Sequence, residues 1–494
     1  MLFLGIDLGS SSVKASVIDG DTGQCIATAF YPPDEMKIIA IRPGWAEQDP
    51  EIWWENLKAA ISSCTSKLGR KKEDIGAIGI SYQMHGLVAV GKDKKILRPS
   101  IIWCDSRGVD YGEKAFHDLG KDFCLSHLLN SPGNFTASKL AWVRENEPGI
   151  FADIFKIMLP GDYIALRLTG EISTTFSGLS EGIFWDFERE CVSSELLEYY
   201  GFNNDLLPEA APSFSVSGKL QASVASELDL PAGIPVAYKA GDQPNNALSL
   251  NVLGPGEVAA TAGTSGVIYG VTDKKKFDAL SRVNTFLHVN HTKADPRLGV
   301  LLCINGTGIL NSWLRRNTGA NLSYNEMNQL AEKVAPGSDG LFILPFGNGS
   351  ERMLGNKDTG AQVNGLNFSI HTSSHLFRAA QEGIAFSFRY GLDIMKETGL
   401  DPLIIRAGEA NMFLSRTFRE SLSCITGKEI VLYNTDGSIG AAIGAGIGCG
   451  YYKSEKEAFR NLKTVSVTTP DSMKISQYEE AFGKWKELMN KLLN

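Results

Sequence analysis

The carboxylate of Asp242 stands where α/β proteins commonly hold their reactive groups. It follows an apolar stretch, residues 235–240, with the pattern of a buried strand, and it precedes Gln243-Pro-Asn-Asn246. Ligands of open α/β sheets bind at the carboxyl ends of the strands. An aspartate at such a strand end can orient a hydroxyl group and accept its proton. The alternative is that Asp242 only caps a turn ahead of the proline.

A second carboxylate, Asp7, follows the apolar residues 2–6 and precedes a loop formed by Gly9, Ser10, Ser11 and Ser12. Backbone N–H groups and hydroxyls of such a loop can hold a phosphate, and the Mg2+ that accompanies nucleotide phosphates prefers carboxylate oxygens. Asp7 is therefore a candidate metal ligand, with turn capping as the alternative. Lys14, on the next strand, can add a positive charge at the phosphates or face the solvent on an edge strand.

The same pattern returns in the second half of the chain. The segment from Asp7 to Val17 can be laid over the segment from Thr261 to Val271 at an offset of 254 residues, close to half of the 494. The residues of the second loop are then Gly263, Thr264 and Ser265. This repeat indicates a duplicated domain with one hydroxyl-rich loop in each half, facing one another across a cleft. Short Gly/Ser/Thr strings also recur by chance.

The tripeptide Met84-His85-Gly86 comes directly after the predicted strand of residues 75–81. Its side chains are expected to project from a strand end into the same cleft, where His85 can donate a hydrogen bond to hydroxyl groups of a ligand. A lone histidine is also commonly a structural hydrogen-bonding residue. Trp45 and Trp103 can offer apolar faces to a ligand or pack the core.

A third loop follows the predicted strand of residues 403–407 and reads Arg406-Ala-Gly-Glu-Ala-Asn411. Gly408 lets the backbone pass close to a ligand, although a plain turn needs a glycine as well. The run of small residues from Gly440 to Gly446 is expected to form a helix packed tightly behind this loop.

Three strands are predicted at the start of the chain, over residues 2–6, 13–18 and 25–30, so the first polar loop joins two strands. A P-loop and a dinucleotide-binding fingerprint both require a strand followed by a helix, and neither motif occurs. Further strands are predicted at 341–345 and the positions given above, and helices at 53–64, 137–146, 375–397 and 478–493. The fold class is therefore α/β, with a domain boundary near residue 246.

Composition excludes several classes of protein. The chain is 43% hydrophobic and 21% charged, with a net charge of -8 and no run of five or six basic residues, so a nucleic acid is not an expected partner. The eight cysteines are spread singly, without a Cys-x-x-Cys pair. Neither a secretion signal nor an apolar stretch of about 18 residues is found, and we expect a cytoplasmic protein with no membrane segment.

These segments together resemble the FGGY family of carbohydrate kinases, which have duplicated actin-like ATPase domains. The resemblance spans about 440 residues in one order and is closest to the branch that acts on xylulose. It rests on the strings Gly5-Ile-Asp-Leu-Gly9, Trp45-Ala-Glu-Gln-Asp-Pro50, Gln83-Met-His-Gly86, Ala137-Ser-Lys-Leu-Ala-Trp142, Leu159-Pro-Gly-Asp-Tyr163, Leu168-Thr-Gly-Glu171, Gly263-Thr-Ser-Gly266, Gly365-Leu366 and Ala380-Gln-Glu-Gly-Ile384.

Two departures from the family pattern are visible. The family commonly has Gly-Asp-Asn followed by small residues where this chain has Asp242 and then Gln243-Pro-Asn-Asn246, which puts the start of the following helix in doubt. The family usually shows Gly-Gly-Gly-Ala or a near variant in the third loop, so the adenine contacts of Gly408 and Asn411 are the least specific part of the resemblance.

The resemblance implies two ribonuclease-H-like domains flanking a catalytic cleft, with residues 1–246 binding the sugar and carrying the first phosphate loop, and residues 247–494 binding ATP. It also implies phosphorylation of D-xylulose to D-xylulose 5-phosphate, with Asp242 as general base. Met84, His85 and Gly86 would contact the sugar. Asp7 would bind Mg2+, Lys14 and both loops would bind the phosphates, and a homodimer would be possible.

Two other functions remain open from the sequence. The chain can be a kinase for another sugar or polyol, such as ribulose, fuculose, gluconate or glycerol, because the phosphate loops would be the same. It can also be a non-catalytic, nucleotide-gated binding protein of the actin and chaperone type. Such a protein needs no sugar base, so Asp242 and the segment 83–86 distinguish it from a kinase.

Overall fold

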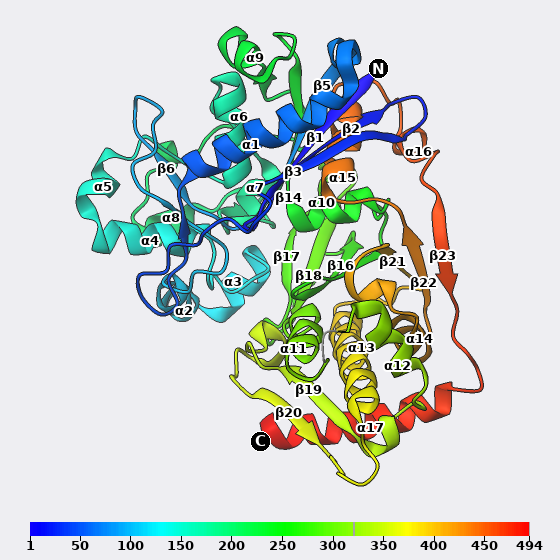
Figure 1. Ribbon diagram of the computed structural model, residues 1–494. Coiled ribbons are helices and arrows are strands. Elements are labelled where there is room, and N and C mark those ends of the chain that lie inside the picture. The colour runs from blue at the N-terminus through cyan, green and yellow to red at the C-terminus, as the bar shows by residue number, and fades with distance from the viewer. Residues whose placement is uncertain (320–321, 494) are drawn as a thin grey trace.

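The computed structural model describes residues 1–319 and 322–493, which fold around two mixed β-sheets (Figure 1). The first sheet has the strand order β13-β14-β5-β1-β2-β3. Its strands are β1 (Leu2–Leu8), β2 (Val13–Asp19), β3 (Cys25–Tyr31), β5 (Ile75–Tyr82), β13 (Gly218–Lys219) and β14 (Pro235–Gly241). The strands β1, β5 and β14 are parallel, and the strands β2, β3 and β13 run antiparallel to their neighbours.

The second sheet repeats this arrangement and adds one strand, in the order β17-β18-β16-β15-β21-β22-β23. Its strands are β15 (Val258–Ala262), β16 (Gly266–Thr272), β17 (Asn284–Leu287), β18 (Leu298–Ile304), β21 (Ile404–Gly408), β22 (Glu429–Tyr433) and β23 (Thr464–Thr468). The strands β15, β21 and β22 are parallel, as β1, β5 and β14 are. The structure therefore supports the predicted duplication, although the second hairpin loop is one residue shorter, with Ala262 opposite Gly266 where Leu8 is opposite Val13.

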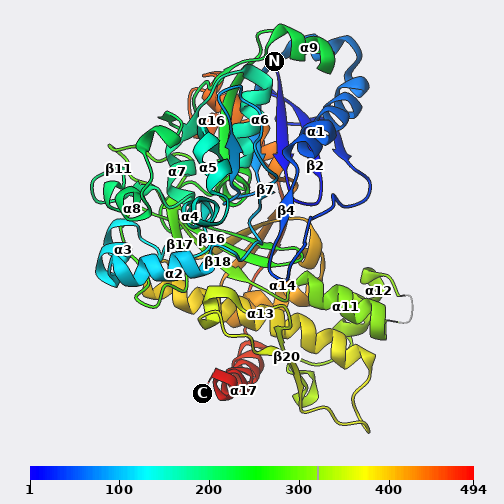
Figure 2. The same cartoon turned by 90° about the vertical axis from the view of Figure 1, so that its left-hand side faces the viewer.

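Helices cover both faces of each sheet. Those of the first half are α1 (Pro50–Thr65), α2 (Val109–Asp118), α3 (Lys121–His127), α4 (Thr136–Asn146), α5 (Pro148–Asp153), α6 (Pro160–Thr169), α7 (Phe176–Glu181), α8 (Ser194–Tyr200), α9 (Ala222–Leu228) and α10 (Asp242–Ser249). Those of the second half are α11 (Gly308–Thr318), α12 (Tyr324–Glu332), α13 (Ser373–Glu397), α14 (Arg416–Thr426), α15 (Gly437–Gly448), α16 (Glu455–Ala458) and α17 (Ile475–Leu493). The chain termini lie at opposite ends of the molecule (Figure 2).

Between β5 and β13, helix α6 packs on β5 and β14 of the first sheet, and most of the remaining segment forms a lobe beside that sheet, in which α2, α3, α4, α7 and α8 lie near short strand pairs (Figure 2). The pairs are β4 (Glu47–Gln48) with β7 (Ser100–Ile101), β6 (Val88–Val90) with β8 (Lys156–Met158), β9 (Thr174–Thr175) with β12 (Ala210–Ala211), and β10 (Trp185–Asp186) with β11 (Cys191–Val192). In the second half, β19 (Phe342–Phe346) pairs with β20 (Gly360–Asn364). The lobe is bonded to the second sheet, because Asn130 and Thr285 exchange two hydrogen bonds.

Helix α15 belongs to the second half of the chain but packs on the first sheet, against β1, β5, β14 and β2. In Figure 1 it is the orange helix among the blue strands. Helix α10 lies beside it and also contacts β15 and β16 of the second sheet. We expected the small-residue helix to pack tightly behind the third loop. A Cβ at Gly408 in that loop would lie 3.3 Å from the Thr435 carbonyl oxygen, just before α15, and the apolar residues of the helix join the cluster formed by strands of the first sheet.

Glycines on both elements let the backbones of α15 and the first sheet approach closely. A Cβ atom at Gly5 would lie 1.8 Å from the carbonyl oxygen of Ser438, and one at Gly79 would lie 1.9 Å from that of Ala441. On the helix side, a Cβ at Gly448 would lie 1.8 Å from the carbonyl oxygen of Ala237. Because the obstructing atoms are backbone, no rotamer change can make room for a side chain.

The structure confirms the predicted strands and helices within a few residues at their ends. The doubt over the helix after Asp242 is resolved, because α10 begins at that residue. Pro244 lies in its first turn, where the backbone N–H that proline lacks would have no intrahelical partner. The predicted boundary near residue 246 falls inside α10. Among the described residues, no helix is long and apolar enough to cross a bilayer.

The close packing of α15 predicts that Gly79→Ala destabilises the protein. The new methyl group would meet the backbone of Ala441, and overpacking of this kind costs about 1–3 kcal/mol. Gly483→Ala is the control, because a Cβ at Gly483 in α17 meets nothing within 4 Å and alanine favours a helix. Thermal unfolding should show a lower midpoint for Gly79→Ala and an equal or higher one for Gly483→Ala. Equal midpoints for the two variants would contradict this account of the interface.

Candidate active site

Asp242 is the first residue of α10, directly beyond the carboxyl end of β14. Burial, together with the charge of Asp7, raises the pKa of this carboxyl to about 7, although hydrogen bonds from the side chain and backbone of Gln243 act in the opposite direction. Gly241 is packed closely, since a Cβ there would lie 2.5 Å from Met84 Cγ and 2.6 Å from Glu181 Oε2. A carboxyl group with this pKa can exchange a proton near neutral pH.

Asp7 lies near the carboxyl end of β1, opposite Lys14 on β2 and Ser81 on β5. Its Oδ1 accepts a hydrogen bond of 2.7 Å from the Ser81 hydroxyl. Its other oxygen faces the start of α15, because a Cβ at Gly437 would lie 2.3 Å from Asp7 Oδ2. Burial raises the pKa of Asp7, and the neighbouring carboxylate of Asp436 raises it as well, while Ser81 and Lys14 lower it.

The first loop, Gly9 to Ser12, is fixed to the body of the protein through its carbonyl oxygens. The Ser10 carbonyl accepts a hydrogen bond of 2.7 Å from Gln48 Nε2, and the Ser11 carbonyl accepts one of 2.8 Å from the backbone of Met36. Ser11 itself is exposed, and the indole N–H of Trp103 reaches the Ser10 hydroxyl at 3.5 Å. The loop is therefore held in place and remains accessible, as a phosphate-binding loop must be.

Trp103 and Trp45 differ in their surroundings. Trp103 is 43% exposed beside the first loop, so its face is accessible to a ligand. Trp45 is stacked under the guanidinium groups of Arg42 and Arg107 and meets Trp142 edge to face. It therefore has the packing role that was the alternative for both tryptophans.

The second loop, residues 263–265, covers the start of α11. The Gly263 carbonyl accepts hydrogen bonds of 2.8 Å from both the Gly308 backbone N–H and the Thr307 hydroxyl. A Cβ at Gly308 would lie 2.4 Å from that carbonyl oxygen, so the close approach requires glycine at position 308. Thr264 is exposed and Ser265 half-buried, so the hydroxyl-bearing part of the loop remains accessible.

The third loop lies next to the second and to the start of α15. Gly408 ends β21, and a Cβ there would lie 3.3 Å from the carbonyl oxygen of Thr435, just before α15. Asn411 has the left-handed backbone conformation, with φ of 54°, and a Cβ at Gly263 would lie 3.6 Å from its Nδ2. Residues 435–437 therefore connect the end of β21 in the second sheet with Asp7 in the first.

His85 is fixed by Glu181 in the lobe of the first half. Its Nδ1 lies 2.9 Å from the backbone carbonyl oxygen of Glu181, and its own carbonyl accepts a hydrogen bond of 2.9 Å from Lys139 Nζ. Burial lowers the pKa of His85 to about 3, with the Lys139 charge acting in the same direction. A carbonyl only accepts, so Nδ1 carries the proton of this neutral ring and Nε2 is an acceptor. This differs from the expectation that His85 donates to ligand hydroxyls.

Met84 and Gly86 flank His85 and serve mainly to seat the tripeptide. Met84 is buried against Gly241, and a Cβ at Gly86 would lie 2.6 Å from the ring of Pro160. The tripeptide therefore packs against Gly241, the residue before Asp242. The charge of Asp7 acts on the Asp242 carboxyl group.

Three groups at the site were missed from the sequence. Asp436 forms an ion pair with Lys14, Glu181 is buried between His85 and Gly241, and Lys139 is fully buried below His85. Burial, together with the charges of Asp242 and Asp162, raises the pKa of Glu181 well above its usual range. Only Lys139 carried a signal, as part of the string from Ala137 to Trp142; the other two depend on long-range packing.

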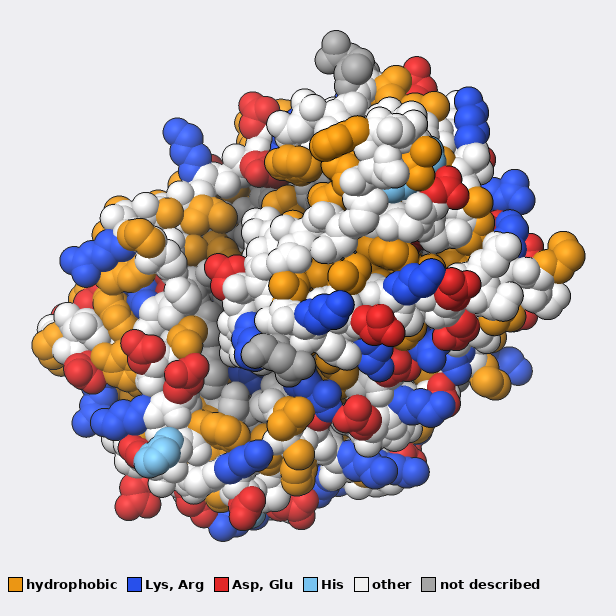
Figure 3. All heavy atoms as spheres, turned by 90° about the horizontal axis from the view of Figure 1, so that it is seen from below, with side chains coloured by type: hydrophobic (Ala, Val, Ile, Leu, Met, Phe, Trp, Pro, Cys, Tyr) orange, Lys and Arg blue, Asp and Glu red, His pale blue; other side chains and the backbone are white. Residues whose placement is uncertain are grey.

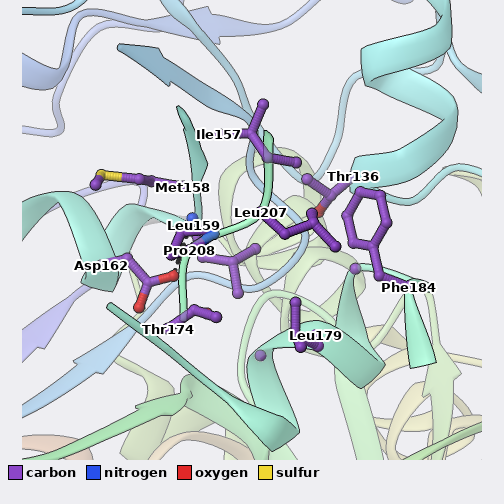
Figure 4. A pocket seen from close by; sticks show the side chains of 12 residues that line it. Thr136, Ile157, Met158, Leu159, Asp162, Thr174, Leu179, Phe184, Leu207 and Pro208 are labelled. Atoms are coloured by element: carbon purple, nitrogen blue, oxygen red, sulfur yellow. Dashed lines mark hydrogen bonds between the residues drawn. The ribbon is translucent and has the colours of Figure 1, made fainter. Parts of the chain in front are cut away.

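The structure has a small internal cavity in the lobe and a larger hollow on its surface. The small apolar cavity between α6, α7 and β8 has a volume of about 20 Å3 and is part of the core of the lobe; the side chains of Leu159, Leu207 and Phe184 line it (Figure 4). It has room for no more than a water molecule. A larger hollow separates the two parts of the surface seen from below, and acidic and basic side chains are interspersed on this face (Figure 3).

The duplicated sheet order and the paired hairpin loops define a two-domain α/β protein with the fold of actin-like ATPases and sugar kinases. Residues 2–249 match the N-terminal domain of the FGGY family of carbohydrate kinases, and residues 258–449 match its C-terminal domain. The chain belongs to this family and is therefore a carbohydrate kinase.

Individual relatives agree along the whole chain. The xylulose kinase of Bacillus subtilis is 28% identical, over 98% of this chain and 96% of its own. The crystal structure of xylulose kinase from Rhodospirillum rubrum has a TM-score of 0.88 and is 26% identical, covering 100% of this chain and 99% of that one. The Plasmodium falciparum glycerol kinase with ADP, at 20% identity and a TM-score of 0.86 over 98% and 97% of the two chains, shares the fold.

The raised pKa of Asp242 predicts that Asp242→Asn stabilises the folded protein at alkaline pH. An unfolded aspartate ionises near pH 3.8 and the folded one near 7, so the cost of the buried charge grows between these values and is complete above pH 7. The thermal midpoint of Asp242→Asn should exceed that of the natural protein more at pH 8 than at pH 5. Asp34→Asn, at an exposed position, is the control. A gap that does not widen with pH would contradict the buried charge.

Proposed function

We propose that the protein transfers the γ-phosphoryl group of ATP to D-xylulose and produces D-xylulose 5-phosphate. The observation that carries this proposal is the place of Asp242, where the Met84-His85-Gly86 segment approaches from one side and the charge of Asp7 from the other. A base for the sugar hydroxyl is needed at just such a junction, between the acceptor and the phosphates. The similarity to the xylulose kinases named above supports the choice of sugar.

Asp242 orients one hydroxyl of the sugar and accepts its proton as that hydroxyl attacks the γ-phosphorus. The oxygen–phosphorus bond to the β-phosphate breaks as the new one forms, and ADP leaves. Neutral His85 accepts a hydrogen bond from a second sugar hydroxyl at Nε2, and this contact fixes the orientation of the ring or chain. The hydroxyls and N–H groups of both hairpin loops, with Lys14, hold the phosphates, and Gly408 and Asn411 lie along the adenosine.

The residues present fit a divalent cation. Asp7 keeps one carboxylate oxygen beyond its bond to Ser81, and its raised pKa indicates a buried charge that a nearby cation would stabilise. Among the described residues, no cluster of three or more His, Cys, Asp or Glu side chains forms a complete metal site, so the remaining ligands would be phosphate oxygens and water, as is usual for Mg2+. When bound, Mg2+ would neutralise charge on the phosphates. Asp7 would be its protein ligand.

A different sugar or polyol is the main alternative, because the Plasmodium falciparum glycerol kinase shares the fold. A non-catalytic nucleotide-binding protein is a second alternative, and the proton-accepting position of Asp242 argues against it. A coupled ADP-release assay with ATP and Mg2+ should distinguish them on xylulose, ribulose, fuculose, rhamnulose, gluconate and glycerol. Selective turnover of D-xylulose is the expected result. Selective ADP release with another compound would make that compound the substrate, and no ADP release with any of the six would overturn the kinase proposal.

The pKa of Asp242 predicts an acid limb in the pH profile. The base works only when it is ionised, so kcat/KM for the sugar should fall about tenfold per pH unit below a midpoint near 7. Asp242→Asn should lose about 10²- to 10⁴-fold in kcat and keep its affinity for ATP, since a general base contributes that much. A flat profile between pH 5 and 8 would show that another group is the base.

His85 is predicted to act on the sugar alone. Removal of the imidazole in His85→Ala should raise the KM for D-xylulose by about tenfold, the cost of a lost hydrogen bond at a buried site, and leave the KM for ATP unchanged. His85→Gln is the matched variant, because its side-chain carbonyl restores an acceptor. An equal rise in both KM values would indicate that His85 only supports the fold of the lobe.

A further inference from the structure

The ion pair between Lys14 and Asp436 joins two residues that are 422 positions apart in the chain. Lys14 Nζ lies 2.5 Å from Asp436 Oδ2, and each side chain is 35% exposed. Lys14 lies on β2 just after the first loop, whereas Asp436 precedes α15. The pair is therefore at the edge of the proposed phosphate site and accessible to a ligand there.

The two carboxylate oxygens of Asp436 have separate partners. Oδ1 caps α15, since it accepts hydrogen bonds from the backbone N–H groups of Ser438 and Ile439 at 2.9 and 3.1 Å and from the Ser438 hydroxyl at 2.7 Å. Oδ2 is left for Lys14. Burial alone would raise the pKa of Asp436, but the Lys14 charge and these donors lower it below its usual value. The carboxylate is therefore charged and fixed in direction.

Lys14 has two carboxylates within its reach. It stands directly opposite Asp7 in the register of β1 and β2, where an ion pair between neighbouring strands would normally form. It pairs with Asp436 instead, and Asp7 bonds to Ser81. The ammonium group thus donates its hydrogen bond to Asp436 rather than to the carboxylate that is proposed to bind the metal, although its charge still acts on Asp7.

We propose that Asp436 is a positioning residue that holds the Lys14 ammonium at the nucleotide phosphates and leaves Asp7 free for the divalent cation. This inference rests on the proposed function, in which Lys14 and Asp7 have those roles. A lysine side chain has many rotamers, and a fixed partner restricts them before the nucleotide binds. An ammonium group has three N–H donors, so two remain for phosphate oxygens after one is given to Asp436.

Asp436→Asn tests the proposal, because the amide keeps a carbonyl oxygen to cap α15 and loses the charge that binds Lys14. The KM for ATP should rise about fivefold, as expected for the loss of one partly exposed ion pair. The Mg2+ concentration for half-maximal activity should rise as well, because Lys14 turns to Asp7. The KM for the sugar and the thermal midpoint should stay unchanged. An unchanged or lower KM for ATP would overturn the proposal.

Two further variants separate this inference from the function on which it rests. Lys14→Met should weaken ADP binding, measured directly by calorimetry, and Asp436→Asn should add nothing to that loss in the double variant. If Lys14→Met leaves ADP binding unchanged, the phosphate role of Lys14 fails first and the inference falls with it. If Lys14→Met weakens binding but the effects of the two substitutions add fully, Asp436 does not act through Lys14. Asp436→Ala, which also removes the cap, should in addition lower the thermal midpoint.

Discussion

The contact of α15 with the first sheet determines the geometry of the whole site. Carbonyl oxygens of Ser438 and Ala441 lie where Cβ atoms would stand at Gly5 and Gly79, so helix and strands meet backbone to backbone. Burial of this interface brings α15, from the last part of the chain, onto β1 and β2 at its start. Gly437 and Asp436 are thereby placed against Asp7 and Lys14, and no local interaction could bring these four residues together. The arrangement of these four residues is a consequence of that packing.

Burial of carboxylates then sets the chemistry of the site. Burial raises the pKa values of both Asp242 and Asp7; the charge of Asp7 adds to the effect on Asp242, and the charge of Asp436 adds to the effect on Asp7. A buried carboxylate is stabilised when a cation binds beside it or when it takes up a proton, so the burial that lowers stability also makes these groups reactive. The ion pair of Lys14 with Asp436 offsets part of this excess negative charge.

The features that could be predicted from the sequence are those set by residues close together in the chain. Strand ends at Asp7, Asp242 and Gly408 follow from apolar runs that stop at polar or glycine residues, and all three lie at carboxyl ends of parallel strands. The repeat of the hairpin loops predicted the duplicated sheets. It did not predict that α15 crosses to the opposite sheet, because a small-residue helix fits closely against any strands rich in glycine. Glu181 and Asp436 were missed because their partners are distant in the sequence and meet them only through long-range packing.

The exchange of α10 and α15 between the halves has a consequence for movement. Both helices begin where a parallel strand ends, and they pack on one another at Gly440, where a Cβ would lie 2.7 Å from Ser249. The amide of Asn245 also donates to the Gly437 carbonyl at 2.8 Å. The chain passes from the first sheet to the second through α10, back through α15, and again to the second sheet between α16 and β23. Because α10 and α15 are packed on each other between the sheets, a rotation of one sheet against the other would have to preserve or shift this contact. Asp242, at the start of α10, and Asp436, at the start of α15, are thus held by the same contact between the two halves.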